Sequence, residues 1–184
     1  MHPLTKGKAT IIELTKTEAS QIKLVYRYTS THYCDLSIRH EPQRWAVEFV
    51  LKPFEKPVEK VSESRFFEDF VEEPRAFAAL LDGEQVGWLE TGHQKWNNRM
   101  RIWEILVKEG FRRQGIGALL MDHAVKMARE KDARALVLET QTCNAPAIDF
   151  YLKHGFELIG FDSTAYTNQD IDRKEVRLEL GLRL

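Results

Sequence analysis

The part of the sequence best suited to chemistry is a basic, glycine-rich stretch that lies between a short apolar run and an amphipathic segment. Gly115 and Gly117 lack a Cβ, so the backbone there can take a positive φ and come close to a ligand. The first turn of the following helix aims unpaired N–H groups and the positive end of its dipole at whatever fills the turn. With Arg112 and Arg113 beside it, this stretch is suited to a phosphate or a pyrophosphate.

Spacing separates the phosphate-binding motifs that this stretch could form. A P-loop needs Lys and Ser or Thr after its second glycine, but Ile116 and Gly117 stand there, so the γ-phosphate of a nucleotide would have no partner. A dinucleotide fingerprint needs a third glycine where Leu120 stands. Glu139 nevertheless lies roughly where a ribose-binding acid would be expected, so the dinucleotide alternative stays open.

A third motif fits the spacing. Arg112-x-x-Gly115-x-Gly117-Ala118 resembles the Arg/Gln-x-x-Gly-x-Gly/Ala signature of the GNAT superfamily of N-acetyltransferases. Asn144-x-x-Ala147-x-x-Phe150-Tyr151-x-x-x-Gly155-Phe156 resembles the later motif of that family, at the expected distance downstream. The resemblance implies an enzyme that moves the acetyl group of acetyl-CoA, its co-substrate, directly to a primary amine without a metal.

The resemblance also implies where the coenzyme binds. In the family, the amides of the turn cradle the pyrophosphate, while a pantetheine arm pairs with the preceding strand like an added strand. The residues so implied for cofactor binding are Leu106, Val107, Arg112, Arg113, Gln114, Gly115, Ile116, Gly117, Ala118, Asn144 and Tyr151. An asparagine at position 144 is also a favourable helix N-cap, and both roles could hold together.

Two side chains are the candidates for proton transfer. Tyr151 matches the family tyrosine beside the coenzyme sulfur, and a phenol can protonate a departing thiolate; the alternative is a purely structural role. Glu104 is the one carboxylate in the apolar run from Ile102 to Val107, where burial makes a carboxylate more basic, as a general base requires. The alternatives are a structural ion pair for Glu104, Glu139 as the base, or a chain of water molecules.

Patterning predicts the elements that must position these residues. Strands are expected over 10–14, 75–81, 85–91, 102–107, 134–141, 156–161 and 175–184, and helices from about Thr17, from Ser62 or Ser64 to Val71, from 116, and over 144–154. Asp82-Gly83 is a type I′ hairpin signal, and Gly92 to Arg99 is expected to be a polar linker. The segment 29–60 is the least legible: Trp45 to Leu51 could be a strand, and its prolines favour turns.

This order of elements is the one that GNAT proteins show. It implies an α/β fold of the α+β, mixed-sheet kind: a mostly antiparallel central sheet, splayed between its fourth and fifth strands and flanked by helices. We expect a single GNAT N-acetyltransferase domain over 1–184, in which about 1–74 shapes the acceptor side and 75–184 forms the acetyl-CoA-binding core.

Composition bounds the partners of the protein. A formal net charge of −1 gives no indication of nucleic acid or of an anionic membrane, and no apolar run approaches the length of a membrane span. The two cysteines follow no metal or redox spacing, and the first ten residues lack the apolar core of a signal peptide. We therefore expect a cytoplasmic protein that acts on a small-molecule amine; dimers are frequent in the family, so a homodimer is an option.

One resemblance reaches further and suggests a substrate. Trp96-Asn97, together with several positions between 138 and 168, resembles streptothricin acetyltransferases, which acetylate an amine on the β-lysine of that antibiotic; the positions are Leu138 to Gln141, Asn144, Phe150-Tyr151, Gly155-Phe156, Asp162, Tyr166 and Asn168. This implies a streptothricin-like acceptor and a role in antibiotic resistance. The alternatives are acetylation of a protein N-terminus, a lysine or a polyamine, or a non-catalytic acyl-CoA-binding module.

Overall fold

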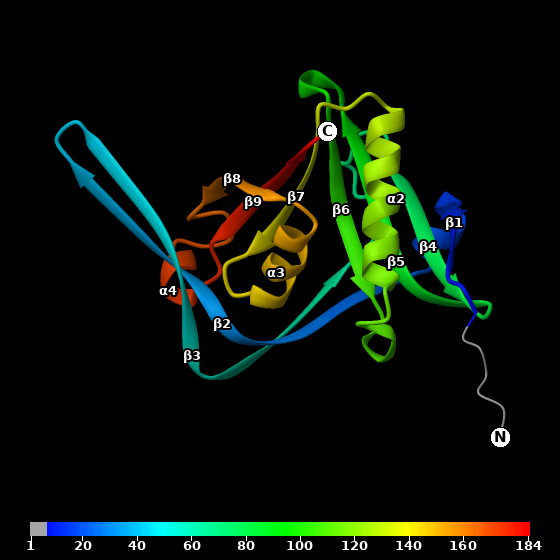
Figure 1. Cartoon of the computed structure of the whole chain (residues 1–184), viewed down its shortest axis with the longest axis horizontal. Helices are drawn as coiled ribbons and strands as arrows, with labels where there is room; N and C mark the ends of the chain where they lie inside the picture. The colour runs from blue at the N-terminus through cyan, green and yellow to red at the C-terminus, as the bar shows by residue number, and fades with distance from the viewer. Residues whose placement is uncertain (1–6) are drawn as a thin grey trace. The chain divides into compact units, whose positions relative to one another are not determined.

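A computed structural model of the chain describes residues 7–184, which form two compact units that alternate along the sequence (Figure 1). The first unit contains the residues up to Tyr26, Ser62–Val137 and Arg183–Leu184. The second unit contains Arg27–Val61 and Leu138–Leu182. The expected division near residue 74 concerns function, with an acceptor side before it and a coenzyme core after it, and it stays a prediction.

The first unit is built mainly from β1 (Thr10–Leu14), α1 (Lys16–Ser20), β4 (Arg75–Leu81), β5 (Glu84–Gln94), β6 (Arg99–Val107) and α2 (Ile116–Glu130). The second unit contains α3 (Ala145–Lys153), β8 (Glu157–Asp162) and α4 (Asp170–Arg173). Four strands have residues in both units: β2 (Leu24–Glu41), β3 (Arg44–Ser64), β7 (Ala135–Gln141) and β9 (Arg177–Arg183).

Hydrogen bonding joins seven strands into one mixed sheet in the order β1-β4-β5-β6-β7-β9-β8. The pairs β1/β4, β4/β5, β5/β6 and β8/β9 are antiparallel, whereas β6/β7 is parallel. The parallel register runs only from Arg99–Ala135 to Arg101–Val137, at the fourth and fifth strands of the sheet, where diverging strands were predicted. The predicted mixed, mostly antiparallel GNAT fold is confirmed.

The sheet of the first unit is covered on both faces. Helix α2 lies along β5 and β6 (Figure 1), and a Cβ at Gly87 would come within 3.0 Å of Ile116 and 3.1 Å of Leu120, so glycine allows the close approach of helix and strand. A separate apolar cluster joins β1, α1 and the start of β2 to the strands; it comprises Leu14, Ala19, Leu24, Phe66, Ala76, Ala78, Trp88 and Leu106. Most residues of β5 are therefore buried, and those of β6 are buried or partly buried.

The segment 29–60, whose structure was the hardest to predict, lies within a long hairpin. Strands β2 and β3 make their own two-stranded sheet, joined by a two-residue turn at Pro42–Gln43. The expectation that the prolines favour turns was wrong for Pro53 and Pro57, which lie within β3. In a two-stranded sheet each strand is an edge, so a proline can face away from its partner without costing a ladder hydrogen bond.

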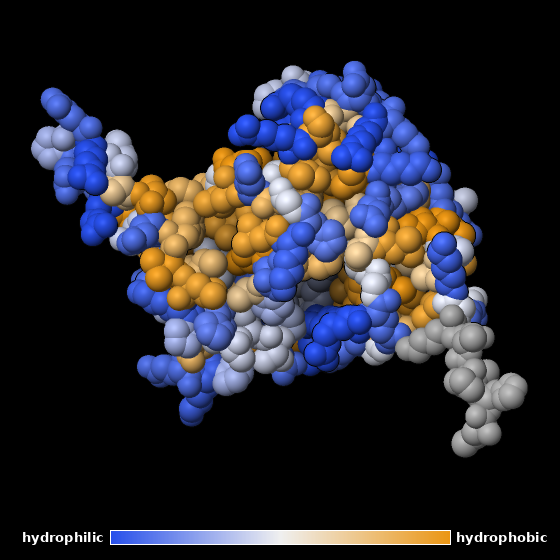
Figure 2. Space-filling view, viewed as in Figure 1, coloured by the Kyte–Doolittle hydropathy of each residue, from blue (hydrophilic) through white to orange (hydrophobic). Residues whose placement is uncertain are grey.

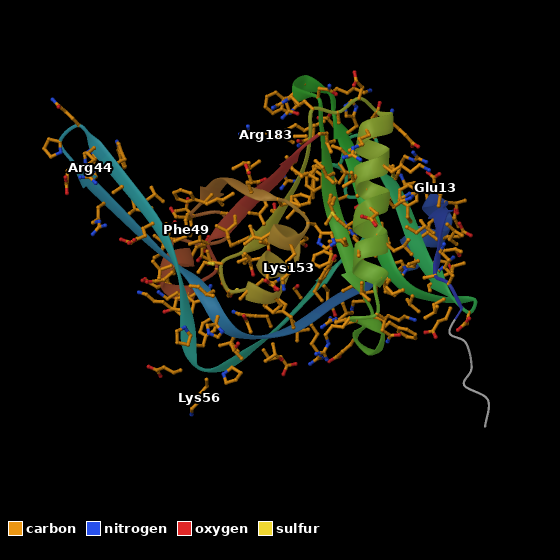
Figure 3. The ribbon with its side chains drawn as sticks, in the orientation of Figure 1. Glu13, Arg44, Phe49, Lys56, Lys153 and Arg183 are labelled. Carbon is orange, nitrogen blue, oxygen red and sulfur yellow. The ribbon has the colours of Figure 1, made fainter. Side chains whose placement is uncertain are left out.

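Contacts within the second unit hold the base of this hairpin, while its tip is polar. Asp35 pairs with Lys174 at 2.9 Å, and Phe49 packs edge-on against Phe161 of β8 with ring centroids 5.4 Å apart (Figure 3). Figure 2 shows a hydrophilic hairpin tip, where Arg44 begins β3 (Figure 3). Anchoring by side chains matters because an isolated two-stranded hairpin is marginally stable in water.

Three other expectations about elements need correction. No helix begins at Ser62 or Ser64: β3 continues to Ser64, and irregular backbone follows, in which the Phe67 N–H donates to Glu90 on β5 instead of to a helical carbonyl. The first helix begins at Lys16 rather than at about Thr17, and Thr15 caps it through a capping box with Glu18. The expected linker from Gly92 is strand as far as Gln94, followed by a short 3₁₀ turn, and α4 was not predicted.

Candidate active site

The start of α2 leaves backbone amides without acceptors in the helix. Gly115 is the N-cap, with φ of 84° and no side-chain cap. The Leu119 N–H donates to the Gly115 carbonyl at 3.0 Å, so the amides of Ile116, Gly117 and Ala118 precede the first intrahelical bond. A Cβ at Gly115 would meet no atom within 4 Å, so glycine is needed here for the left-handed conformation and not for space.

The basic turn before α2 is tied to the end of β6. The Arg112 Nε donates to the Val107 carbonyl at 3.3 Å, and the Gln114 Nε2 donates to the Gly110 carbonyl at 3.0 Å. Arg113 has φ of 59°, a second left-handed residue two positions before Gly115. Alternation of this kind makes a concave row of amides, which binds anions. The residues predicted to hold the pyrophosphate are therefore brought together.

Leu106 and Val107 differ in the direction of their backbone groups. The Lys108 N–H donates to the Val86 carbonyl on β5 at 2.9 Å. Because backbone groups alternate along a strand, the Leu106 amide also faces β5, whereas the Val107 amide faces the opposite edge of β6. Of the two, Val107 is the better placed to pair with an extended ligand along that edge.

Glu104 accepts hydrogen bonds from two hydroxyl groups. The Tyr26 Oη donates to its Oε2 and the Ser64 Oγ to its Oε1. The residue directly opposite on β5 is Glu90, so that strand presents a second carboxyl group to Glu104. The register shifts beside this pair, which leaves Trp103 as an extra residue on β6.

Glu90 was not predicted as a site residue. It is 1% exposed and accepts the Phe67 N–H at 2.8 Å. Burial, with smaller contributions from Glu104 and Glu68, raises the pKa of Glu90 to about 7. The signal that singled out Glu104, a carboxylate within an apolar strand, is also present at Glu90 between Val86 and Thr91, so the same argument could have found it.

The remaining predicted residues lie in the second unit. Tyr151 is 8% exposed on α3, with ring centroids 5.5 Å from Phe150 and 6.0 Å from Phe156. Asn144 caps α3 by accepting the Ala147 N–H at 3.3 Å, as the N-cap alternative predicted. Glu139 pairs with Arg177 at 2.9 Å and accepts the Tyr166 hydroxyl at 3.3 Å. Glu139 is therefore already paired with a cation, unlike a base awaiting a substrate.

No metal site or membrane span is evident among residues 7–184. They contain no group of three or more His, Cys, Asp or Glu side chains arranged to hold a metal ion. None of the helices in this described part is long and apolar enough to cross a membrane.

Comparison with known proteins identifies the family. Residues 38–156, more than half of the chain, match the model of the acetyltransferase (GNAT) family. The chain therefore belongs to the GNAT family, as its two motifs predicted.

Particular relatives narrow the comparison. Streptothricin acetyltransferase from Streptomyces lavendulae is 43% identical over 93 residues, which cover 50% of this chain and 49% of that enzyme, so the match spans about half the length of that relative. Streptothricin acetyltransferase A from Bacillus subtilis (strain 168) is 31% identical over 134 residues, 65% of this chain and 77% of that enzyme. The crystal structure of nourseothricin acetyltransferase matches with a TM-score of 0.75 at 27% identity, covering 95% of this chain and 98% of that one.

Proposed function

We propose that this protein is an N-acetyltransferase that moves the acetyl group of acetyl-CoA to a primary amine of a streptothricin-like antibiotic. The observation that carries the proposal is the uncapped start of α2 behind the Arg112–Arg113 turn, in a chain of the GNAT family. The antibiotic is proposed from the names of the relatives in Streptomyces lavendulae and Bacillus subtilis. Because acetyl-CoA is a cytoplasmic metabolite, the proposed reaction belongs to the cytoplasm.

The first unit offers the groups that would hold the coenzyme. A pyrophosphate at the start of α2 would accept from the amides of Gln114 to Ala118, where the helix dipole also favours negative charge. Arg112 and Arg113 add two positive charges beside it. The outward-facing amide of Val107 would pair with the pantetheine arm, and a hydrogen bond from Asn144 to the same arm stays a prediction.

The chemistry needs two protons to leave the acceptor nitrogen and one to reach the coenzyme sulfur. The acceptor ammonium first gives a proton to the Glu104 carboxylate, and the neutral amine nitrogen then attacks the thioester carbonyl. Collapse of the intermediate forms the amide bond and breaks the C–S bond; the attacking nitrogen loses its second proton to water, and the Tyr151 hydroxyl gives its proton to the departing thiolate and regains one from solvent. A backbone donor aimed at the developing oxyanion would contribute about 3 kcal/mol. The hydroxyls of Tyr26 and Ser64 would hold Glu104 in a fixed orientation for the first transfer.

Thermal melting tests the coenzyme site. A ligand that binds only the folded protein raises its melting temperature, so acetyl-CoA and CoA should each raise it, while NADH and ATP should not. A shift with NADH and none with either coenzyme would contradict the proposal and favour the dinucleotide alternative.

Release of the CoA thiol tests the reaction and the acceptor. Streptothricin should support release at a lower concentration than a polyamine, free lysine or a peptide with a free N-terminus. Tyr151→Phe should slow release with streptothricin while leaving the melting shift with CoA intact, because only the proton donor is lost. Binding of CoA without thiol release from any of these amines would instead favour a non-catalytic acyl-CoA-binding module.

A further inference from the structure

Two carboxyl groups face each other across β5 and β6 in the first unit. Glu90 and Glu104 are register partners, and directly opposite residues on antiparallel strands project from the same face of the sheet. This is the face that carries Trp88 and Leu106, away from α2, and it is closed by the apolar cluster around Phe66. Two acidic side chains thus share a largely apolar site next to the strand end that leads to the coenzyme turn.

The surroundings of Glu90 supply little to offset a negative charge. On β4 its register partner is Ala76, which carries no charge. The segment that covers it contributes the Phe67 N–H and the Glu68 carboxylate, and Glu68 is paired with Arg65. Within residues 7–184, no lysine, arginine or histidine forms an ion pair with Glu90. The charged groups that raise the pKa of Glu90 are the carboxyl groups of Glu104 and Glu68.

Glu104 is the better solvated member of the pair. It is partly buried and accepts from the Tyr26 and Ser64 hydroxyls, whereas Glu90 is fully buried. The extra residue Trp103 shifts the register beside the pair, and bulges of this kind re-aim side chains next to active sites. The two carboxyl groups thus differ in their surroundings, which lets them take different protonation states.

We propose that Glu90 and Glu104 form a coupled carboxyl pair that holds one proton in the free protein, with Glu90 as a positioning residue that keeps Glu104 ready to accept the proton of the substrate ammonium. Two carboxylates in one apolar site disfavour double ionisation, so the pair titrates as a unit. Burial raises the pKa of Glu90 to about 7, which puts the shared proton on Glu90 rather than on Glu104 at neutral pH.

The pair would also couple acceptor binding to protonation. A bound ammonium favours the doubly ionised pair, so the proton on Glu90 leaves to solvent when a cationic acceptor binds. The ammonium then passes one proton to Glu104, which leaves a neutral amine and returns the pair to a single proton. No oxidant or further reactant is needed, and charge is conserved in each step. This role of the pair in proton transfer rests on the proposed acetyl transfer. That the pair shares one proton does not depend on the proposed function.

The first experiment measures stability, not activity. The folded protein holds a proton on Glu90 at pH values where the unfolded chain, with the ordinary pKa of 4.5, has lost it. The stabilisation this gives is complete below pH 4.5 and is lost as pH rises towards 7, so the melting temperature should fall across this window. Glu90→Gln keeps the shape and an acceptor for the Phe67 N–H but cannot titrate, so the fall should be reduced in this variant.

The matched control is Glu157→Gln, which changes an exposed glutamate of β8 and should leave the fall unchanged. If the melting temperatures of E90Q and the parent protein keep a constant difference from pH 4.5 to pH 7, Glu90 titrates normally and the pair is ruled out. If E90Q folds poorly, Glu90→Met removes the charge in a side chain of similar length, and the same comparison applies.

The second experiment measures the pH dependence of kcat/KM for the acceptor. In the parent protein the profile should show an inflection near pH 7, where the pair loses the proton held on Glu90, and E90Q should lack this inflection. A residue that only supports the fold would lower kcat/KM by one factor at every pH, and that result would overturn the positioning role. If no amine is acetylated at all, the proposed function fails while the stability experiment still decides whether Glu90 holds a proton up to about pH 7.

Discussion

The two helices that follow the central strands begin in opposite ways. Helix α2 starts at Gly115, which has no side chain and a φ of 84°, so its first amides have no cap. Helix α3 starts at Asn144, whose side chain accepts from the Ala147 N–H at 3.3 Å. Both follow a strand of the same sheet, β6 in one case and β7 in the other. A helix that caps itself gains stability from its own sequence, whereas one that leaves its amides unpaired is suited to a ligand.

The glutamates on these same two strands also differ in the partners of their carboxyl groups. Glu104 on β6 accepts from two neutral hydroxyls, and Glu139 on β7 lies 2.9 Å from the Arg177 guanidinium. The Arg177 guanidinium already gives Glu139 a charged partner, whereas the two hydroxyls hold the Glu104 carboxyl in a fixed orientation. Both glutamates lie in apolar strands, so the sequence alone does not separate them. Their partners in the structure show which one is the better candidate for a general base. Each of the following variants tests one side of this contrast.

The largest effect is expected at Glu104. Glu104→Gln keeps an oxygen that can accept from Tyr26 and Ser64 but cannot take a proton, so kcat/KM should fall by about 10²–10⁴, the usual contribution of a general base. Glu139→Gln is the matched variant on β7, and it should leave kcat/KM within about threefold because it removes the charge opposite Arg177 in an ion pair that is partly exposed. Steady-state thiol release with a saturating coenzyme measures both. A large loss in E139Q with a small loss in E104Q would reverse the assignment.

A smaller effect is expected at the start of α2. Gly115→Ala places a Cβ at a left-handed position, which costs about 1–2 kcal/mol. If the turn relaxes to escape this strain, binding must restore it, and the Kd of acetyl-CoA should rise about tenfold. Isothermal titration measures this change.

Gly110→Ala is the control for the same turn. A Cβ at Gly110 would also meet nothing within 4 Å, but Gly110 has no positive φ, so its substitution should leave the Kd nearly unchanged. Equal weakening by both substitutions would mean that the conformation of Gly115 is not what binding requires.

Signals within a few residues were enough to predict the turns and caps. Asp82-Gly83 predicted a type I′ hairpin, and the two residues have φ of 51° and 84°. The helix expected over 144–154 ends at Lys153, and Gly155 has φ of 84° just beyond its C-cap, as is usual for a glycine that ends a helix. Such features depend on one or two residues whose backbone preferences are strong, so the sequence alone could predict them.

Features that depend on distant residues were missed. The segment from Ser62 to Val71 has helical spacing, but the Phe67 N–H is used by Glu90, 23 positions away. The long β2–β3 hairpin is held by partners such as Lys174 and Phe161, which are more than 100 residues further along the chain. Glu90 and Glu104 face each other because of the register between β5 and β6, beside which Trp103 is an extra residue. Neither the register nor the extra residue can be recognised from a short stretch of sequence.

The smallest effect is expected at Asn144, where a cap and a coenzyme contact are proposed for one side chain. Asn144→Ala should lower the free energy of unfolding by about 1 kcal/mol, because the Ala147 N–H loses its cap. Asn144→Ser restores a capping oxygen and should recover most of that stability in urea unfolding. Serine is too short to reach the pantetheine arm, so the Kd of acetyl-CoA should stay about fivefold higher in both variants, the equivalent of one neutral hydrogen bond. A serine variant with unchanged affinity would make Asn144 a cap alone, and the start of α3 would then have no part in binding.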